Sequence, residues 1–204
     1  TAVPAGGALA VDRDDFSALV TKTVEEDPLI DIVRGEVTEI PADGVVIIAA
    51  GPLASDALSN EIEKICPGHL SFYDAAAPIV SAQSLDMSCA FQQSRYDRGG
   101  EDDYINCPMN KEEYEAFYEA LVGAESAETH SFDKRKGVYE GCMPIEVMAL
   151  RGQDTIRFGP MKPVGLRDPR TGHRPWAVLQ LRKENSAGTM YNLVGFQTNL
   201  KFGE

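Results

Sequence analysis

The longest apolar run in the chain, Val45 to Ala50, limits what the chain can fold into. Such a run spans a β-strand but falls far short of the ~18 residues that a membrane-crossing helix needs. Because every residue in it is apolar, the pattern predicts a strand over Val45–Ala49 that is buried on both faces. Two more strand-sized runs come before it, at Ile30–Arg34 and Glu36–Ile40, and are separated by turn residues.

Helix signals flank these predicted strands. Asp12 is placed to cap a helix that ends before Pro28, and Ser55 or Asp56 to cap one that ends at Pro67. The apolar positions at helical spacing are Phe16, Leu19, Val20 and Val24 in the first and Leu58, Ile62 and Ile65 in the second. Helix, strands and helix in this order predict an α/β fold that begins in the middle of a domain.

The second half of the chain predicts a helix and a hairpin most clearly. Asn110 and Glu113 have the spacing of a capping box, and the apolar stripe that follows them is expected to pack into a core. That stripe consists of Tyr114, Phe117, Tyr118 and Leu121. A short helix is predicted over Pro144–Leu150, and strands over Trp176–Lys183 and Thr189–Gln197 form a hairpin through residues 185–188.

Some expected signals are missing. The glycine pairs at 6–7 and 99–100 lack the spacing, strand and helix of a GxGxxG dinucleotide-binding loop. The first four residues, Thr1 to Pro4, have neither the basic nor the apolar region of a signal peptide. The sequence is therefore interpreted as cytoplasmic.

Cys107 is the most interesting of the four cysteines. No CxxC pair occurs and only three histidines accompany the thiols, so zinc binding has little support. Cys107 comes shortly before the helix capped by Asn110, where the helix macrodipole is expected to lower the pKa of a thiol. A buried, inert thiol is the alternative. Cys66 and Cys89 are interpreted as packing or incidental residues, and Cys142 as a weaker candidate for a chemical role.

Charge is unevenly distributed along the chain. The net charge is -13, which argues against a nucleic-acid partner, but residues 134–201 hold 12 Lys and Arg against 5 Asp and Glu. Four of these cations lie in a proline- and glycine-rich stretch over residues 157–172, which predicts a stiff, basic loop that could meet phosphates. They are Arg157, Lys162, Arg167 and Arg170. A long surface loop without a ligand is the alternative.

Several strings, in order along nearly the whole chain, resemble one family. They are Val3–Arg13, Gly51–Leu53, Phe72–Val80, Tyr104–Met109, Gly141–Ala149, Arg157–Leu166 and Tyr191–Lys201. The chain resembles the folate- and FAD-dependent tRNA (uracil-5-)-methyltransferases, which make 5-methyluridine in the T-loop. The resemblance implies an FAD-binding domain of the glutathione-reductase type, returning over residues 1–55, and a mixed α/β insertion domain over most of residues 56–204.

The resemblance also implies functional roles. Reduced flavin takes the methylene group of methylenetetrahydrofolate to C5 of uracil, NAD(P)H supplies electrons, and a thiolate adds to C6. The cysteine of the Asn-Cys-Pro string, Cys107, matches that nucleophile. The cofactor-side residues are expected to be Val37, Ala49, Ala50 and Gly51. Without a phosphate-binding loop, the isolated chain is expected neither to hold FAD tightly nor to turn over. A non-catalytic RNA-binding module and a paralogue specific for ribosomal RNA remain alternatives.

Overall fold

An antiparallel sheet forms the centre of the computed structural model, which describes residues 2–3, 5, 9–51, 54–67, 77–98, 100, 103–125 and 143–201. Its five strands lie in the order β3-β7-β6-β5-β4, and each neighbouring pair runs antiparallel. The strands are β3 (Ile79–Ser81), β4 (Phe91–Gln92), β5 (Tyr104–Met109), β6 (Ala177–Lys183) and β7 (Met190–Leu193). The predicted hairpin is confirmed as β6 and β7, and β5 lies beside β6.

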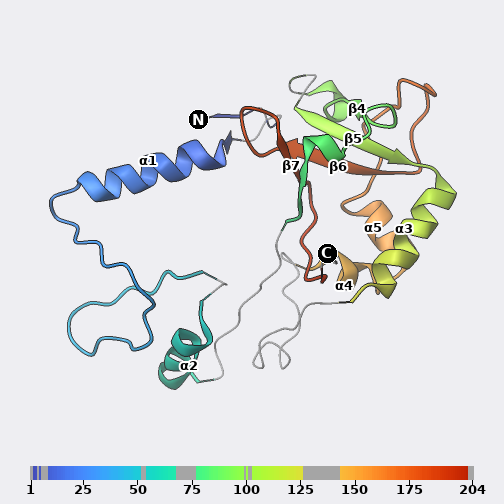
Figure 1. Ribbon diagram of the computed structural model, residues 1–204. Helices are drawn as coiled ribbons and strands as arrows, with labels where there is room; N and C mark the ends of the chain where they lie inside the picture. Colours follow the sequence, from blue (N-terminus) through green and yellow to red (C-terminus); the bar gives the residue numbers. More distant parts are fainter. Residues whose placement is uncertain are drawn as a thin grey trace.

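Three helices cover one face of this sheet (Figure 1). They are α3 (Lys111–Gly123), α4 (Ile145–Ala149) and α5 (Gln153–Phe158). The capping box at the start of α3 is confirmed, since Asn110 and Glu113 each accept a hydrogen bond from the other's backbone N–H. The apolar stripe of α3 packs into the largest core cluster as predicted, together with Ile145, Ile156 and Met161.

The other face of the sheet is covered by a long loop over residues 159–175. Leu166 from this loop, Phe91 from β4 and Val178 from β6 form a separate buried cluster. Short 3-10 turns over Ala82–Ser84 (η1) and Arg95–Asp97 (η2) lie in the connections on either side of β4. The described strands and helices confirm the general expectation that the chain combines α and β structure.

Within the described residues, the N-terminal third contains two helices and one small two-stranded sheet. A small ribbon of β1 (Ala2–Val3) and β2 (Ala10–Val11) leads into α1 (Arg13–Glu26), and α2 (Asp56–Ile65) follows later. Both helices are confirmed, with Asp12 and Ser55 as their caps. However, no residue of α1 is buried. In Figure 1, α1 projects away from the sheet and a long irregular segment connects it to α2.

The strands predicted at Ile30–Arg34, Glu36–Ile40 and Val45–Ala49 are wrong for this structure. All of residues 27–51 are described, and none of them belongs to a strand. Val45 and Ile47 are 96% and 85% exposed, although their pattern is that of a doubly buried strand. A strand needs a neighbour to satisfy its backbone N–H and C=O groups, and none of the described segments pairs with this one.

Asp12 attaches the start of α1 to the turn between β6 and β7. Its carboxylate accepts hydrogen bonds from the backbone N–H groups of Asp14 and Asp15 and from the N–H and hydroxyl of Ser186. These bonds, the one from the Ser186 backbone foremost, lower the pKa of Asp12 to about 2 because they favour the charged carboxylate. An ion pair between Arg13 and Glu184, at 3.0 Å, lies beside them.

This attachment is expected to fail only in strong acid. Because the pKa of Asp12 lies below its ordinary value of 3.8, its contribution is complete above about pH 4 and is lost as the pH falls through about 2. Hydrogen exchange at the Asp14 and Ser186 amides, corrected for intrinsic rates, should report the opening. Asp12→Asn keeps a capping oxygen but cannot titrate, so its exchange should not follow this pH dependence. The same acid-induced opening in that variant would contradict the assignment.

Candidate functional site

Cys107 lies in the middle of β5, opposite Leu179 of β6. Alternation along the strand puts it on the same face as Ile105 and Met109, and it packs beside the cluster of Ile105, Leu181 and Tyr191. Its side chain is half-buried, whereas Cys66 and Cys89 are exposed. Cys142 lies outside the described residues. Among the described thiols, Cys107 is therefore the one held by regular structure.

The expectation that the following helix lowers the pKa of Cys107 is wrong. Burial, and secondarily the neighbouring Cys89, raises the pKa of the Cys107 thiol above its ordinary value of 9.0. The reason is structural: Cys107 belongs to a strand and packs against apolar side chains, while α3 begins only after the cap at Asn110. Removal from water disfavours the thiolate. Near neutral pH this sulfur is therefore protonated in the described structure.

A buried polar network lies on the face of β5 opposite Cys107. Its central residue is Asn106, which precedes Cys107 in the sequence. The side-chain N–H groups of Asn106 donate to the carbonyls of Phe91 and Gln93, at 3.3 and 2.8 Å. Its side-chain oxygen accepts from Gln180 at 2.9 Å. Gln180 in turn accepts from Arg95 at 3.2 Å. Because Asn106 is 0% exposed and every polar atom of its side chain has a partner, the network fixes β4, β5 and β6 together.

Arg95 extends this network to the proline- and glycine-rich loop. One guanidinium nitrogen of Arg95 donates to the carbonyls of Lys162 and Val164, at 2.7 and 2.8 Å. The backbone N–H of Tyr96 donates to the carbonyl of Gly165 at 2.8 Å. The loop is therefore held by hydrogen bonds to the η2 turn and by the burial of Leu166. This agrees with the stiffness that the prolines predict.

The four predicted RNA-binding cations differ in their contacts. Arg157 belongs to α5, where its guanidinium stacks over Trp176 at 3.7 Å and its Nε donates to the Trp176 carbonyl. Arg170 holds Asp168 with two hydrogen bonds and donates to the Ser88 carbonyl. The guanidinium groups of Arg157 and Arg170 are therefore engaged in contacts within the protein. Lys162 and Arg167 are exposed on the loop.

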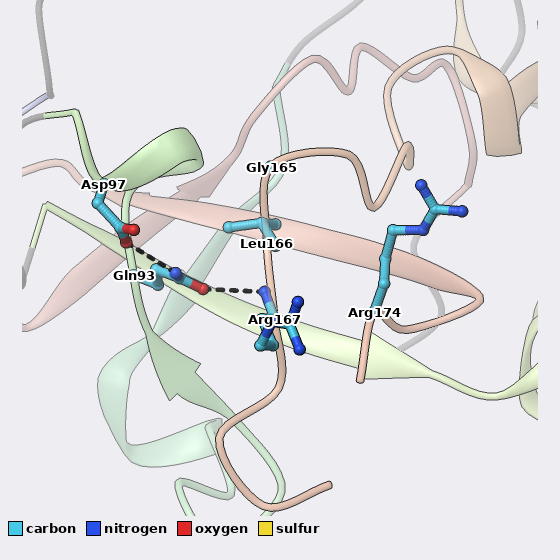
Figure 2. Close-up of a pocket in the computed structure, with 6 residues that line it drawn as sticks. All are labelled: Gln93, Asp97, Gly165, Leu166, Arg167 and Arg174. Atoms are coloured by element: carbon cyan, nitrogen blue, oxygen red, sulfur yellow. Dashed lines mark hydrogen bonds between the residues drawn. The ribbon is translucent and has the colours of Figure 1, made fainter. Parts of the chain in front are cut away.

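Arg167 lies between two adjoining cavities on the loop side of the sheet. One has a volume of about 500 Å³ and is lined by Gln93, Asp97, Gly165, Leu166, Arg167 and Arg174. The other, of about 580 Å³, shares Gln93, Asp97 and Arg167 and is completed by Phe91, Gln92, Ser94, Gly100 and Pro169. Figure 2 shows the hydrogen bonds from Gln93 to Asp97, at 2.8 Å, and from the Arg167 backbone to Gln93, at 3.1 Å.

Most of these residues could not be identified from sequence. Gln93, Asp97 and Arg174 belong to no pattern, and only the folding of the loop over β4 brings them together. One local signal is visible only in the backbone: Tyr96 and Asp97 both have positive φ, at 57° and 54°. Such angles are costly for residues other than glycine and gather at functional sites.

The cofactor-side candidates do not form a site within the described structure. Val37 is 55% exposed, and Ala49, Ala50 and Gly51 are exposed in an irregular segment. A dinucleotide site requires a strand end aimed at the phosphates, and residues 27–51 contain no strand. As described, these residues do not fit FAD. The described residues also contain no cluster of His, Cys, Asp or Glu that could hold a metal ion. None of the described helices has the length and apolarity to cross a membrane.

Fold and site together define an α/β chain of two unlike parts. One is a self-contained sheet that carries a half-buried thiol on one face and a cationic loop on the other. The other part, toward the N-terminus, exposes apolar residues that the sequence pattern predicts to be buried. The family model described as glucose inhibited division protein A matches residues 2–204, and the chain belongs to this family.

The chain is also similar to curated proteins named methylenetetrahydrofolate-tRNA-(uracil-5-)-methyltransferase TrmFO. It is 60% identical to that of Lactobacillus johnsonii over 100% of the chain, 60% to that of Desulforamulus reducens over 99%, and 61% to that of Moorella thermoacetica over 99%. The chain covers 46% of each of these relatives and so spans about half their length. The resemblance seen in the sequence is thereby confirmed.

Proposed function

We propose that the chain is the central part of a flavoprotein that transfers a one-carbon unit from methylenetetrahydrofolate to C5 of a T-loop uridine in tRNA. The observation that carries the proposal is 60–61% identity along the whole chain to proteins named for this reaction. FAD, methylenetetrahydrofolate and NAD(P)H would serve the complete protein, which would act on tRNA in the cytoplasm.

In this proposal the sulfur of Cys107 is the nucleophile. Addition of a thiolate to C6 of uracil moves electron density to C5, which can then form a bond to the incoming carbon. Loss of the C5 proton and cleavage of the bond between the carbon and its carrier would leave a methylene group on C5. A hydride, with electrons that NAD(P)H would supply, would reduce this group to methyl as the S–C6 bond breaks, which restores the ring and the cysteine. Because burial raises the pKa of Cys107, the complete site must supply a group that accepts the thiol proton or a contact that stabilises the thiolate.

The exposed N-terminal part supports the proposed division into domains. We propose that residues 1–55 return to an FAD-binding domain and that residues 56–204 form mainly the insertion. The apolar side chains of Phe16, Leu19 and Ile47 are 49%, 55% and 85% exposed, which is the pattern of elements that lack their partners. Segments of the complete protein would cover them. Val37, Ala49, Ala50 and Gly51 would approach the cofactor only then.

The direct test is the reaction itself. Purified full-length protein is incubated with a tRNA transcript, methylenetetrahydrofolate and NADPH, and 5-methyluridine is measured by mass spectrometry after nuclease digestion. Formation of 5-methyluridine at one T-loop position supports the proposal. A ribosomal RNA fragment in place of tRNA tests the paralogue alternative. RNA binding without methyl transfer would favour a non-catalytic module.

The isolated chain of 204 residues is expected to carry almost no flavin. The reason is that Val37 and residues 49–51 do not form a cofactor surface in the described structure. Heating the purified chain and measuring flavin absorbance in the supernatant should give less than about a tenth of an equivalent, because an unformed site loses affinity by the ordering cost of its segments. The full-length protein is the control. Near-stoichiometric flavin from the chain alone would refute this expectation.

A further inference from the structure

Building on the proposed RNA substrate, we propose that the two adjoining cavities over β4 bind one guanosine nucleotide of single-stranded RNA. The phosphate would lie between Arg167 and Arg174, and the donor edge of the base would face Asp97. The volumes of about 500 and 580 Å³ are in the range of small-molecule sites and accommodate a nucleotide.

The cationic side chains leave donors available for a phosphate. Arg167 uses one guanidinium nitrogen for the Gly172 carbonyl, at 2.7 Å, and its other nitrogens have no hydrogen-bond partner among the described residues. Arg174 is exposed, lines the same cavity and forms no ion pair with any described residue. This distinguishes both from Arg157 and Arg170, which are occupied by contacts within the chain. Guanidinium groups suit phosphate because of their planar, bidentate donors.

The position of the Asp97 carboxylate favours guanine. Gln93 is fixed at both ends, since its oxygen accepts from the Arg167 backbone and its nitrogen donates to Oδ1 of Asp97. The other carboxylate oxygen, Oδ2, has no hydrogen bond to any described residue (Figure 2). A carboxylate can only accept, and guanine is the base whose Watson–Crick edge presents two adjacent donors, N1–H and the N2 amino group.

An aromatic ring lies against Gly165, which lines one of the two cavities. Tyr96 is 62% exposed, and its ring covers Gly165, where an added Cβ would come within 3.0 Å of it. The guanidinium of Arg98 lies 5.9 Å from the ring centroid. Unpaired RNA bases stack on such rings and on arginine planes. Tyr96 and Asp97, which carry this ring and the carboxylate, both have positive φ, a conformational cost of the kind that gathers at functional sites.

The test uses fluorescein-labelled RNA hexamers, UUGUUU and UUIUUU, whose affinities for the full-length protein are measured by anisotropy. Inosine lacks the N2 amino group, so wild type should prefer the guanosine hexamer by about five- to tenfold. Asp97→Asn should abolish this preference, and asparagine tolerates the positive φ of this position. Arg174→Ala should weaken both hexamers about three- to tenfold and reduce the slope of log affinity against log salt by about 0.7. Lys111→Ala, an exposed cation on α3, is the matched control and should change nothing.

The outcomes separate this inference from the proposed function. Equal affinity for both hexamers in wild type, or an unchanged preference in Asp97→Asn, would overturn the guanosine site. The guanosine site would also be overturned if Arg174→Ala weakened the binding of a folate triglutamate but left RNA binding unchanged. The anion bound at Arg174 would then be a carboxylate and not a phosphate. Methyl transfer to tRNA by wild type is measured separately. Its presence together with any of these results would leave the proposed function intact and reject only the site.

Discussion

Replacing Cys107 with alanine in the full-length protein should lower the rate of 5-methyluridine formation by at least about a thousandfold. The reason is that no other described thiol lies in the sheet: Cys66 and Cys89 are exposed and outside the strands. Binding of tRNA should stay within about twofold of wild type, because Cys107 carries no charge near neutral pH and contributes little to phosphate contacts. Single-turnover assays with saturating tRNA measure the chemical step directly.

Cys89→Ala is the matched control, since Cys89 is a neighbouring thiol that is exposed and not held in a strand. Its rate should be close to that of wild type. A denaturing gel should show a covalent RNA adduct with wild type when 5-fluorouridine replaces the target uridine, and none with Cys107→Ala. Undiminished methyl transfer by Cys107→Ala would remove the nucleophile from the proposal, while the family assignment would stand.

A second large effect is expected at Asn106. Asn106→Ala leaves the carbonyls of Phe91 and Gln93 and the side-chain amide of Gln180 without their partner in a buried position. Unsatisfied buried polar groups and the lost volume should together lower the free energy of unfolding by about 2–4 kcal/mol. Urea denaturation followed by the fluorescence of Trp176, the residue before β6, gives the change in midpoint.

The control is Gln92→Ala, which removes an exposed amide from the adjacent strand. Its free energy of unfolding should change by less than about 0.5 kcal/mol. If Asn106→Ala were as stable as this control, the network of Asn106, Gln180 and Arg95 would contribute no net stability. The loop over residues 159–175 would then be ordered by its other contacts, among them the burial of Met161 and Leu166 and the hydrogen bond from the Tyr96 backbone to Gly165.

The helices were predictable because their signals are local. Asp12, Ser55 and Asn110 each cap a helix through a side-chain oxygen that bonds a backbone N–H two or three residues on, and no distant residue is needed for that bond. The short helix α5 was not predicted: it starts at Gln153, after Gly152, without a side-chain cap, and no local signal separates Gln153–Phe158 from the basic loop.

Strands and site depended on contacts between distant segments. The pattern of Val45–Ala49 predicts burial on two faces, but a pattern cannot supply the neighbouring strands, and none of the described residues does. The reverse error concerns Cys107, whose pKa the sequence predicts to be lowered because the helix capped by Asn110 follows so closely. The pairing of β5 with β6 decides its environment instead. Arg157 and Arg170 looked free in the sequence because Trp176 and Ser88 meet them only after folding.

One strand, β5, serves two chemically opposite surfaces. Asn106 faces the polar network and Cys107 faces the apolar cluster, and the two differ by a single step along the backbone. A shift of pairing by one position would exchange them, leaving an amide among hydrocarbon side chains and a sulfur among hydrogen-bonding groups. Insertion or deletion of one residue within Tyr104–Met109 should therefore be selected against far more strongly than most point substitutions. The number of residues in this segment is thus constrained as well as their identities.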